Sequence, residues 1–239
     1  MRDRSDGSLG MPYQPPAWAP SSLLAQLSPE DAEALLAAGS PRTFARGDWL
    51  MLLGESGTYV VVLTSGCVKV LGDPADGRTT LLAVRAAGDV VGELSVLDGE
   101  PRSASVIAAS HVRGRLIEAR AFHALLAARP RIGQVVQRVV AAKLRRQIRH
   151  RMEIGAQPVT VGLARVIEHL GTEYGQPIPE GTLIAVPLSQ PELAALVAAE
   201  RSSVERALRR LRERGAVVTG YRRVIITDWT ALRGVASGT

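Results

Sequence analysis

Hydrophobic and polar positions change their spacing along this 239-residue chain. Residues 1 to about 20 carry Pro, Gly and Ser without periodicity, which is typical of a disordered arm. The following run, LLAQLSPEDAEALLAAG, has helical spacing and predicts one helix or a helical pair. From about Phe44 to Glu118, short apolar runs alternate with Gly- and Asp-containing turns, at a spacing of about 8 to 12 residues. This spacing predicts an antiparallel β-barrel or β-roll.

After His123 the spacing becomes helical, and we expect it to remain so up to a predicted hairpin near the C-terminus. A helix of about 33 Å is predicted from Ile132 to Met152, too long for one small roll to cover. An identical helix of a second subunit is the simplest cover, which predicts a homodimer, while a helix wedged between two domains of one monomer is the alternative. The apolar stripe consists of Ile132, Val136, Val139, Val140, Leu144, Ile148 and Met152.

Two short helices and a hairpin are predicted near the C-terminus. The first helix begins at Ser189 with Glu192 three residues later, which is the pattern of a capping box. After a break at residues 198–200, the second helix has a buried face and ends at Gly215. The run AVVTGYRRVIITD then has the pattern of a hairpin. This order of elements predicts a winged helix-turn-helix.

The net charge of +6 favours an anionic partner. Arginines concentrate in residues 143–151 and 200–215, and they occupy the polar face of the second short helix. Because this face coincides with a turn and a wing, we expect double-stranded DNA rather than a merely solvated surface. The predicted DNA contacts are Ser189, Gln190, Arg201, Ser202, Ser203, Arg206, Arg222 and Arg223.

The stretch GELSVLDGEPRS, residues 92–103, places a carboxylate and a guanidinium among glycines. Amides at the start of a short helix after Gly92, together with Arg102 and Ser103, suit a phosphate. Glu93 cannot face a phosphate, so it needs a neutral donor such as a ribose hydroxyl, and the two features together indicate a nucleotide. The equally weighted alternative is a salt bridge between Glu93 and Arg102 that closes the loop.

Several classes of protein are not expected. A single cysteine, Cys67, excludes an internal disulfide, an iron-sulfur cluster and a structural zinc site. The four histidines are scattered and no HExxH occurs, so we expect neither an enzyme nor a bound metal. No stretch suits a membrane span and the first residues lack an apolar signal region, so we expect a cytoplasmic protein without a membrane partner. A haem-based gas sensor would need Cys67 or His111 as an axial ligand.

Two segments carry a family resemblance. GDVVGELSVLDGEPRSASV resembles the phosphate-binding cassette of cyclic nucleotide-binding domains, and RGDWLMLLGESGTYVVVLTSGCVKV resembles the strands that precede it. With the long helix and the winged helix-turn-helix, the chain resembles the Crp/Fnr family of bacterial transcription regulators from about residue 22 to 230. The resemblance implies that Gly92, Glu93, Leu94, Arg102, Ser103 and Ala104 surround the cyclic phosphate and ribose, and that Arg201, Ser202 and Arg206 read bases.

The sequence also departs from the family. Where the cAMP receptor branch offers a Thr-Ser pair to adenine, the chain has Gln147 and Ile148, and only Gln147 can bond to a base edge. The neighbouring Arg145, Arg146 and Arg149 suit a guanine or a second phosphate, so a cyclic dinucleotide stays open, as does a purely solvated role.

Two further departures lie in the helix-turn-helix. The recognition helix carries Arg201-Ser202-Ser203-Val204 in place of the common Arg-Glu-Thr-Val, so a different operator is expected. Ala198 stands at a turn position often held by Gly, where a left-handed alanine costs about 1 kcal/mol.

We therefore predict an α+β protein with an antiparallel β-roll, a long dimerisation helix and a C-terminal winged helix-turn-helix. Its parts are an arm (1–20), a cyclic nucleotide-binding β-roll (21–130), the dimerisation helix (131–154) and the DNA-binding domain (155–239). The expected function is ligand-gated transcription regulation through an inverted-repeat operator. The expected effector is cAMP first, then cGMP or c-di-GMP, with haem or no small molecule as further alternatives. RNA polymerase is an expected partner if the protein activates transcription.

Overall fold

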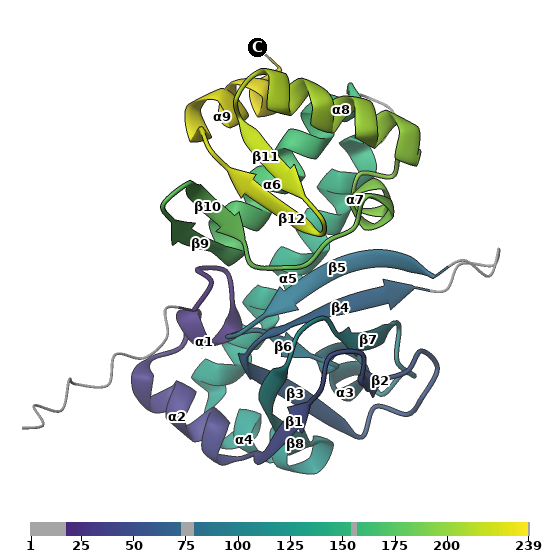
Figure 1. Cartoon of the computed structure of the whole chain (residues 1–239). Coiled ribbons are helices and arrows are strands. Elements are labelled where there is room, and N and C mark those ends of the chain that lie inside the picture. Colours follow the sequence, from purple (N-terminus) through teal and green to yellow (C-terminus); the bar gives the residue numbers. More distant parts are fainter. Residues whose placement is uncertain (1–17, 73–78, 154–156, 239) are drawn as a thin grey trace, which may run out of the picture.

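The computed structural model describes residues 18–72, 79–153 and 157–238. They form an N-terminal unit, residues 18–129, and a C-terminal unit, residues 159–238, joined by one long helix (Figure 1). Most of the expected arm, residues 1–17, lies outside the described residues. Of its last three residues, Ala19 is buried and its carbonyl accepts a hydrogen bond from Ser22.

The N-terminal unit is the predicted antiparallel β-roll. Its two four-stranded sheets have the orders β1-β8-β3-β6 and β2-β7-β4-β5. Side chains of β3 alternate, so that Val61 and Leu63 point into the roll while Val60 and Val62 face the helices. The strands are β1 (Ser40–Phe44), β2 (Trp49–Met51), β3 (Tyr59–Ser65), β4 (Cys67–Gly72), β5 (Thr80–Ala86), β6 (Val90–Val91), β7 (Ser105–Ala108) and β8 (Val112–Glu118).

Helices cover the outer side of β3 and β8. The expected helical pair is present as α1 (Leu23–Gln26) and α2 (Pro29–Ala37), and the two helices begin at the side-chain caps Ser22 and Ser28. α4 (Ala119–Ala128) and the start of α5 (Pro130–Glu153) complete this layer. None of the helices in the described parts of the chain is long and apolar enough to cross a membrane.

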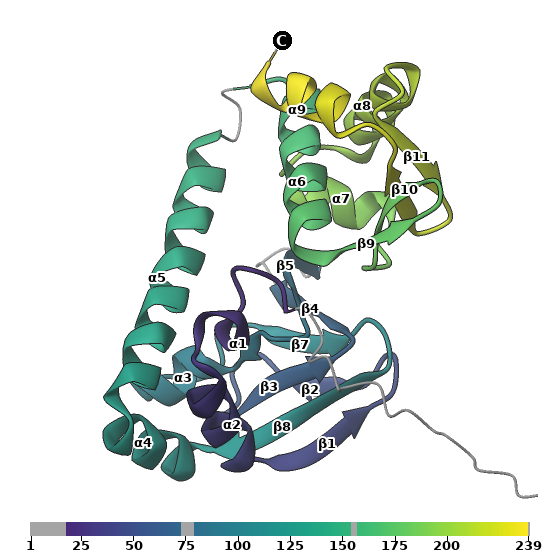
Figure 2. The same ribbon diagram turned by 90° about the vertical axis from the view of Figure 1, so that its left-hand side faces the viewer.

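The apolar stripe of α5 divides into two parts. Ile132, Val136 and Val139 are buried against the N-terminal unit of the same chain, so this part needs no partner subunit. Leu144, Ile148 and Met152 are 60%, 50% and 73% exposed. This second part of α5 stands clear of the N-terminal unit in Figure 2.

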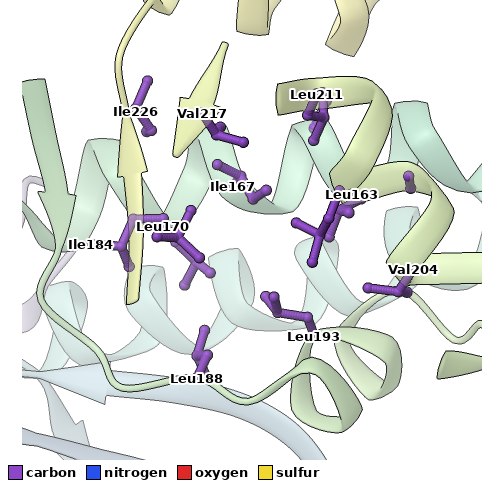
Figure 3. Packing of buried hydrophobic residues seen from close by; sticks show 14 of the residues in the cluster. Leu163, Ile167, Leu170, Ile184, Leu188, Leu193, Val204, Leu211, Val217 and Ile226 are labelled. Atoms are coloured by element: carbon purple, nitrogen blue, oxygen red, sulfur yellow. The ribbon is translucent and has the colours of Figure 1, made fainter. Parts of the chain in front are cut away.

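The C-terminal unit contains the predicted winged helix-turn-helix. Its first helix, α6 (Val159–Tyr174), packs against α8 (Arg201–Glu213) and α9 (Trp229–Ser237) around an apolar core that includes Leu163, Ile167 and Leu211 (Figure 3). The wing is the hairpin of β11 (Val217–Gly220) and β12 (Arg223–Ile226).

The expectation that helical structure continues up to the C-terminal hairpin is wrong. β9 (Gly175–Ile178) and β10 (Gly181–Ile184) follow α6 and extend the sheet of the wing to the order β11-β12-β10-β9. Pro177 and Pro179 in this segment disfavour a helix, because proline has no backbone N–H to donate. α7 (Gln190–Leu196) then begins the helix-turn-helix.

Candidate functional site

The cassette, residues 92–104, follows β6 and contains the short helix α3 (Glu93–Asp98). Gly92 precedes this helix with a φ of 80°, in the left-handed region that glycine tolerates best. A Cβ atom at this position would lie 2.5 Å from Nη1 of Arg102. Glycine is therefore required both for the turn and for the close approach of the arginine.

Arg102 is only 3% exposed, and protein oxygens surround its guanidinium. Nη1 donates to the carbonyl of Gly92 at 2.6 Å and to Oγ of Ser95 at 2.8 Å, while Nη2 donates to the carbonyl of Tyr59 at 2.6 Å. The guanidinium also lies 4.9 Å from the centre of the Tyr59 ring. Burial lowers the pKa of Arg102 from its ordinary value, yet an arginine remains charged. The cation is thus held in place by neutral groups.

Glu93 is also buried, and its ion partner is Lys143 of α5 at 2.7 Å. Nζ of Lys143 donates in addition to the carbonyl of Val90 at 3.0 Å. The alternative of a Glu93–Arg102 salt bridge is wrong for this structure, because Arg102 bonds to Gly92, Ser95 and Tyr59 instead. Sequence reasoning missed Lys143, whose contact with Glu93 joins residues 50 positions apart.

The remaining cassette residues differ in exposure. Ser103 is exposed and Ala104 is half-buried, while Leu94 is 43% exposed on α3. Of the pair expected near a base, Gln147 lies one turn after Lys143, and Ile148 is on the exposed side of α5 with Leu144. The structure therefore gathers Gly92, Glu93 and Arg102 around α3, with Gln147 and Ile148 further along α5.

A cavity of about 640 Å³ lies between α5, α6, β5 and the turn after α7. Gln147 lines it, whereas Gly92, Arg102 and Ser103 do not. Its cationic side chains are Arg85, Lys143, Arg146, Arg149 and Arg165. Arg146 donates to Nε2 of His169 on α6 at 2.8 Å, because a guanidinium has donors only. Burial and the neighbouring Arg146 lower the pKa of His169 to about 4, in keeping with this accepting role. The volume is within the range of small-molecule sites, but the predicted phosphate contacts Gly92, Arg102 and Ser103 lie outside this cavity, in the cassette.

α7 begins with the predicted capping box. Oγ of Ser189 accepts from the backbone N–H of Glu192, and the Glu192 carboxylate accepts from both the amide and the hydroxyl of Ser189. Ser189 therefore caps α7, and a phosphate would have to compete for its donors. Ala198 in the following turn has a φ of 48°, so the left-handed alanine is present. Gly215 closes α8 with a φ of 68°.

The exposed face of α8 is a cationic surface. Arg201 pairs with Glu205 at 2.8 Å, and Arg206 donates to Oγ of Ser203 at 3.0 Å, so both pairs lie along the helix surface. Arg212 donates to Oγ1 of Thr219 at 2.8 Å and thereby joins α8 to the wing. A groove on this face is lined by Gln190, Ser202, Glu205, Arg206, Arg209 and Arg212.

The turn of the wing carries the other predicted DNA contacts. Arg222 has a φ of 52°, and its guanidinium lies 5.8 Å from the centre of the Tyr221 ring, which is 91% exposed. Arg223 is exposed at the start of β12. Of the predicted DNA contacts, Gln190, Ser202 and Arg206 thus line the groove, and Arg222 and Arg223 belong to the wing. Ser189 and Arg201 do not line the groove, and Ser203 lines the cavity beside α5 instead.

The chain matches two known domain families in the order of its units. Residues 41–129 match the cyclic nucleotide-binding domain, and residues 163–235 match the Crp-like helix-turn-helix domain. The cassette and the face of α8 described above fall inside these two matches.

Similar proteins extend over most of the chain. It is 30% identical over 202 residues to the CRP-like cAMP-activated global transcriptional regulator of Mycobacterium tuberculosis, which covers 84% of the chain and 90% of that protein. FixK2 from Bradyrhizobium japonicum has the same fold, with a TM-score of 0.71 at 18% identity over 82% of the chain and 96% of FixK2. The c-di-GMP-responsive regulator CLP of Xanthomonas campestris has a TM-score of 0.70 at 21% identity, over 84% of the chain and all, 100%, of CLP.

Proposed function

The chain belongs to the Crp/Fnr family of transcription regulators rather than to any class of enzymes, and on that premise we propose that a 3′,5′-cyclic mononucleotide gates its binding to DNA. Among the cyclic mononucleotides, cAMP is placed before cGMP. The observation that carries this proposal is the cassette, in which a buried guanidinium lies against a left-handed glycine.

Each cassette residue has a proposed role. Arg102 exchanges neutral acceptors for the cyclic phosphate, because a phosphate adds the attraction of an opposite charge and accepts two parallel hydrogen bonds from one guanidinium. Ser103 adds its exposed hydroxyl, and Glu93 accepts from the ribose 2′-hydroxyl while Lys143 balances its charge. Leu94 and Ala104 supply apolar contacts beside them.

The second part of the α5 stripe supports a homodimer. Leu144, Ile148 and Met152 recur at four-residue spacing and remain exposed in the single chain, so a second α5 is the proposed cover. Gln147 and Ile148 then lie near the junction of the two chains, where Gln147 is proposed to contact the base. Light scattering of the wild type should give a dimer, and Leu144→Asp should give monomers or an unfolded chain.

DNA is proposed to contact the groove on α8 and the wing. Two recognition helices related by a twofold axis read half-sites about 10 base pairs apart, so the operator is an inverted repeat. Arg206 is the proposed guanine contact, with Arg201, Ser202, Ser203 and Gln190 beside it and with Arg222 and Arg223 on phosphates. Contact with RNA polymerase is proposed for the case that the protein activates transcription.

A cyclic dinucleotide is the second candidate effector. The cavity beside α5 favours it, because the volume suits a larger ligand and its cations suit a second phosphate. Haem with Cys67 as its axial ligand is disfavoured, since burial raises the pKa of the Cys67 thiol and so opposes the thiolate that binds iron.

Calorimetry of the full chain against cAMP, cGMP and c-di-GMP tests the proposal. Wild type should bind one cyclic mononucleotide, Arg102→Ala should not, and Glu93→Ala should bind more weakly. Arg113→Ala is a matched control, because Arg113 is exposed on β8 and donates to Oγ of Ser65 outside the cassette. If the wild type binds none of the three nucleotides, gating by a cyclic nucleotide is excluded. If it binds only c-di-GMP, the second candidate is correct.

A further inference from the structure

The sheet of β4 and β5 has one face inside the roll and one face against the C-terminal unit. Along β4, Val68 and Val70 point into the roll core, while Cys67 and Leu71 join the apolar cluster that continues into the C-terminal unit. Lys69 lies between them on the same outward face and is only 8% exposed. A buried ammonium requires a charged or strongly polar partner.

That partner is Glu192 of α7, which lies 2.5 Å from Nζ of Lys69. Its other carboxylate oxygen accepts from Ser189 and completes the capping box. Burial raises the pKa of Glu192, but the hydrogen bonds from Lys69 and Ser189 outweigh burial and hold it below its ordinary value. One carboxylate thus caps the first helix of the helix-turn-helix and also fixes that helix to the N-terminal unit.

The interface around this pair is suited to opening. Its other hydrogen bonds include Ser21 to Glu173 at 2.6 Å, Tyr174 to the carbonyl of Val84 at 3.1 Å, and Arg146 to His169. The cavity of about 640 Å³ lies at the same junction, so the two units are incompletely packed there. The junction is thus apolar where Cys67, Leu81 and Val84 join the C-terminal cluster, and polar and incompletely packed elsewhere. Interfaces between domains that are not large and wholly hydrophobic allow relative motion.

We propose that Lys69 is a positioning residue of the regulator, whose pair with Glu192 holds α7 and α8 against the β4–β5 sheet in an arrangement that opposes DNA binding. This inference rests on the proposed function of the C-terminal unit as a gated DNA-binding domain. The direction follows from the place of the contact. Ser189 and Gln190, which are predicted DNA contacts, are at the start of α7, in the turn that the N-terminal unit contacts through Glu192.

One substitution distinguishes this positioning role from a purely electrostatic one, because the two roles predict opposite changes in DNA affinity. Lys69→Met removes a cation, and the loss of a cation lowers DNA affinity when charge alone decides. If the Lys69–Glu192 pair holds α7 and α8 in the arrangement that opposes DNA binding, the same substitution instead raises DNA affinity. Glu192→Gln gives a second view, because glutamine retains the capping interaction with Ser189 and loses the charge.

The experiment measures fluorescence anisotropy of an operator duplex, selected from random DNA by the wild type, at fixed salt without nucleotide and with cAMP. Lys69→Met should bind about fivefold more tightly than wild type without nucleotide, and cAMP should then change its affinity less. The double variant with Glu192→Gln should gain less than the two single gains combined. Lys69→Arg should behave as wild type, as should Arg129→Gln, whose partners Glu30 and Asp31 lie within the N-terminal unit.

Unchanged or weaker DNA binding by folded Lys69→Met overturns the inference. If wild type itself fails to bind DNA, the proposed function fails, and small-angle X-ray scattering then decides the inference separately. Lys69→Met should increase the mean distance between the two units in that measurement. An unchanged scattering profile would show that the Lys69–Glu192 pair does not position α7.

Discussion

The cassette and α8 each place an arginine where we propose that an anion binds, but they hold it in opposite ways. Arg102 is 3% exposed, and its guanidinium donates to three protein oxygens. Arg206 is exposed, and its guanidinium donates to Oγ of Ser203 on the same helix surface. Binding at the cassette therefore exchanges protein contacts for ligand contacts, whereas binding at α8 displaces mainly water.

This difference indicates where regulation acts. The face of α8 is already formed, since its apolar side is buried and Arg212 joins it to the wing. In the proposed gating, a ligand therefore acts on the position of α8 rather than on its shape. The cassette can transmit such a change, because Glu93 contacts Lys143 and the next turn of α5 contacts His169 of the C-terminal unit.

Arg102→Ala should have the largest effect, because it breaks the cassette itself. The substitution removes the Arg102 donor from the carbonyl of Tyr59, at about 1–3 kcal/mol for a buried unsatisfied group, while the carbonyl of Gly92 still accepts from Oγ of Ser95 at 3.4 Å. We expect the free energy of unfolding to fall by about 1–3 kcal/mol and nucleotide binding to be lost. Urea unfolding and calorimetry measure the two effects.

Arg102→Lys separates the contribution of the positive charge from that of the planar arrangement of donors. Lysine retains the charge but cannot form the planar fork of donors, so it should recover part of the binding and little of the stability. Full stability in Arg102→Ala would show that the three contacts contribute nothing, and the contrast with Arg206 would then be wrong.

The contact between the two units should respond to pH. Burial and the cation of Arg146 lower the pKa of His169 to about 4, below its ordinary 6.5. The unfolded chain therefore takes up a proton first, so stability is complete above about pH 6.5 and is lost as the pH falls towards about 4. The loss is at most about 3 kcal/mol, at about 1.4 kcal/mol for each pKa unit. Glu173 opposes the shift and Arg85 adds to it.

His169→Gln provides the matched variant, since glutamine still accepts a hydrogen bond from Arg146 but does not titrate. Urea midpoints followed by circular dichroism between pH 4 and 7 should fall less steeply for this variant than for wild type. Equal slopes would mean that His169 is protonated without cost in the folded protein.

Local chemistry explains what the sequence predicted well. The capping box is recognisable from Ser189 and Glu192, and the wing from its alternating apolar pattern. The turns around α3 are recognisable from their glycines, which adopt left-handed backbone angles. Each of these signals comes from residues that are close together in the chain. The strand β1 was not predicted, because Ser40–Phe44 is an exposed strand without alternating apolar residues. The ion pairs of Lys143 and Lys69 were not predicted, because their partners are 50 and 123 positions away in the sequence. Only tertiary packing brings each lysine to its carboxylate.

Arg206→Ala should have a moderate effect that is confined to the preference for particular bases in DNA. The residue lies in the groove on α8 with Ser202 and Arg209, and a bidentate arginine-guanine contact contributes about 1–3 kcal/mol of discrimination. Its exposed side chain packs in no core, so stability should stay within about 0.5 kcal/mol of wild type. Sites selected from random DNA should lose preference at one base pair in each half-site. An unchanged preference would assign base reading to another residue.

Arg223→Ala on the wing should have the smallest effect and the least specific one. Arg223 is exposed at the start of β12 and does not line the groove on α8. A phosphate contact lacks sequence information, so affinity should fall by a similar factor for operator and random duplexes. The slope of log affinity against log salt should decrease by about one for each contact removed. Anisotropy titrations at several salt concentrations measure this slope, with Arg206→Ala as the comparison. A loss limited to the operator would instead make the wing a base-reading element, and the contrast between a reading helix and a merely positioning wing would no longer hold.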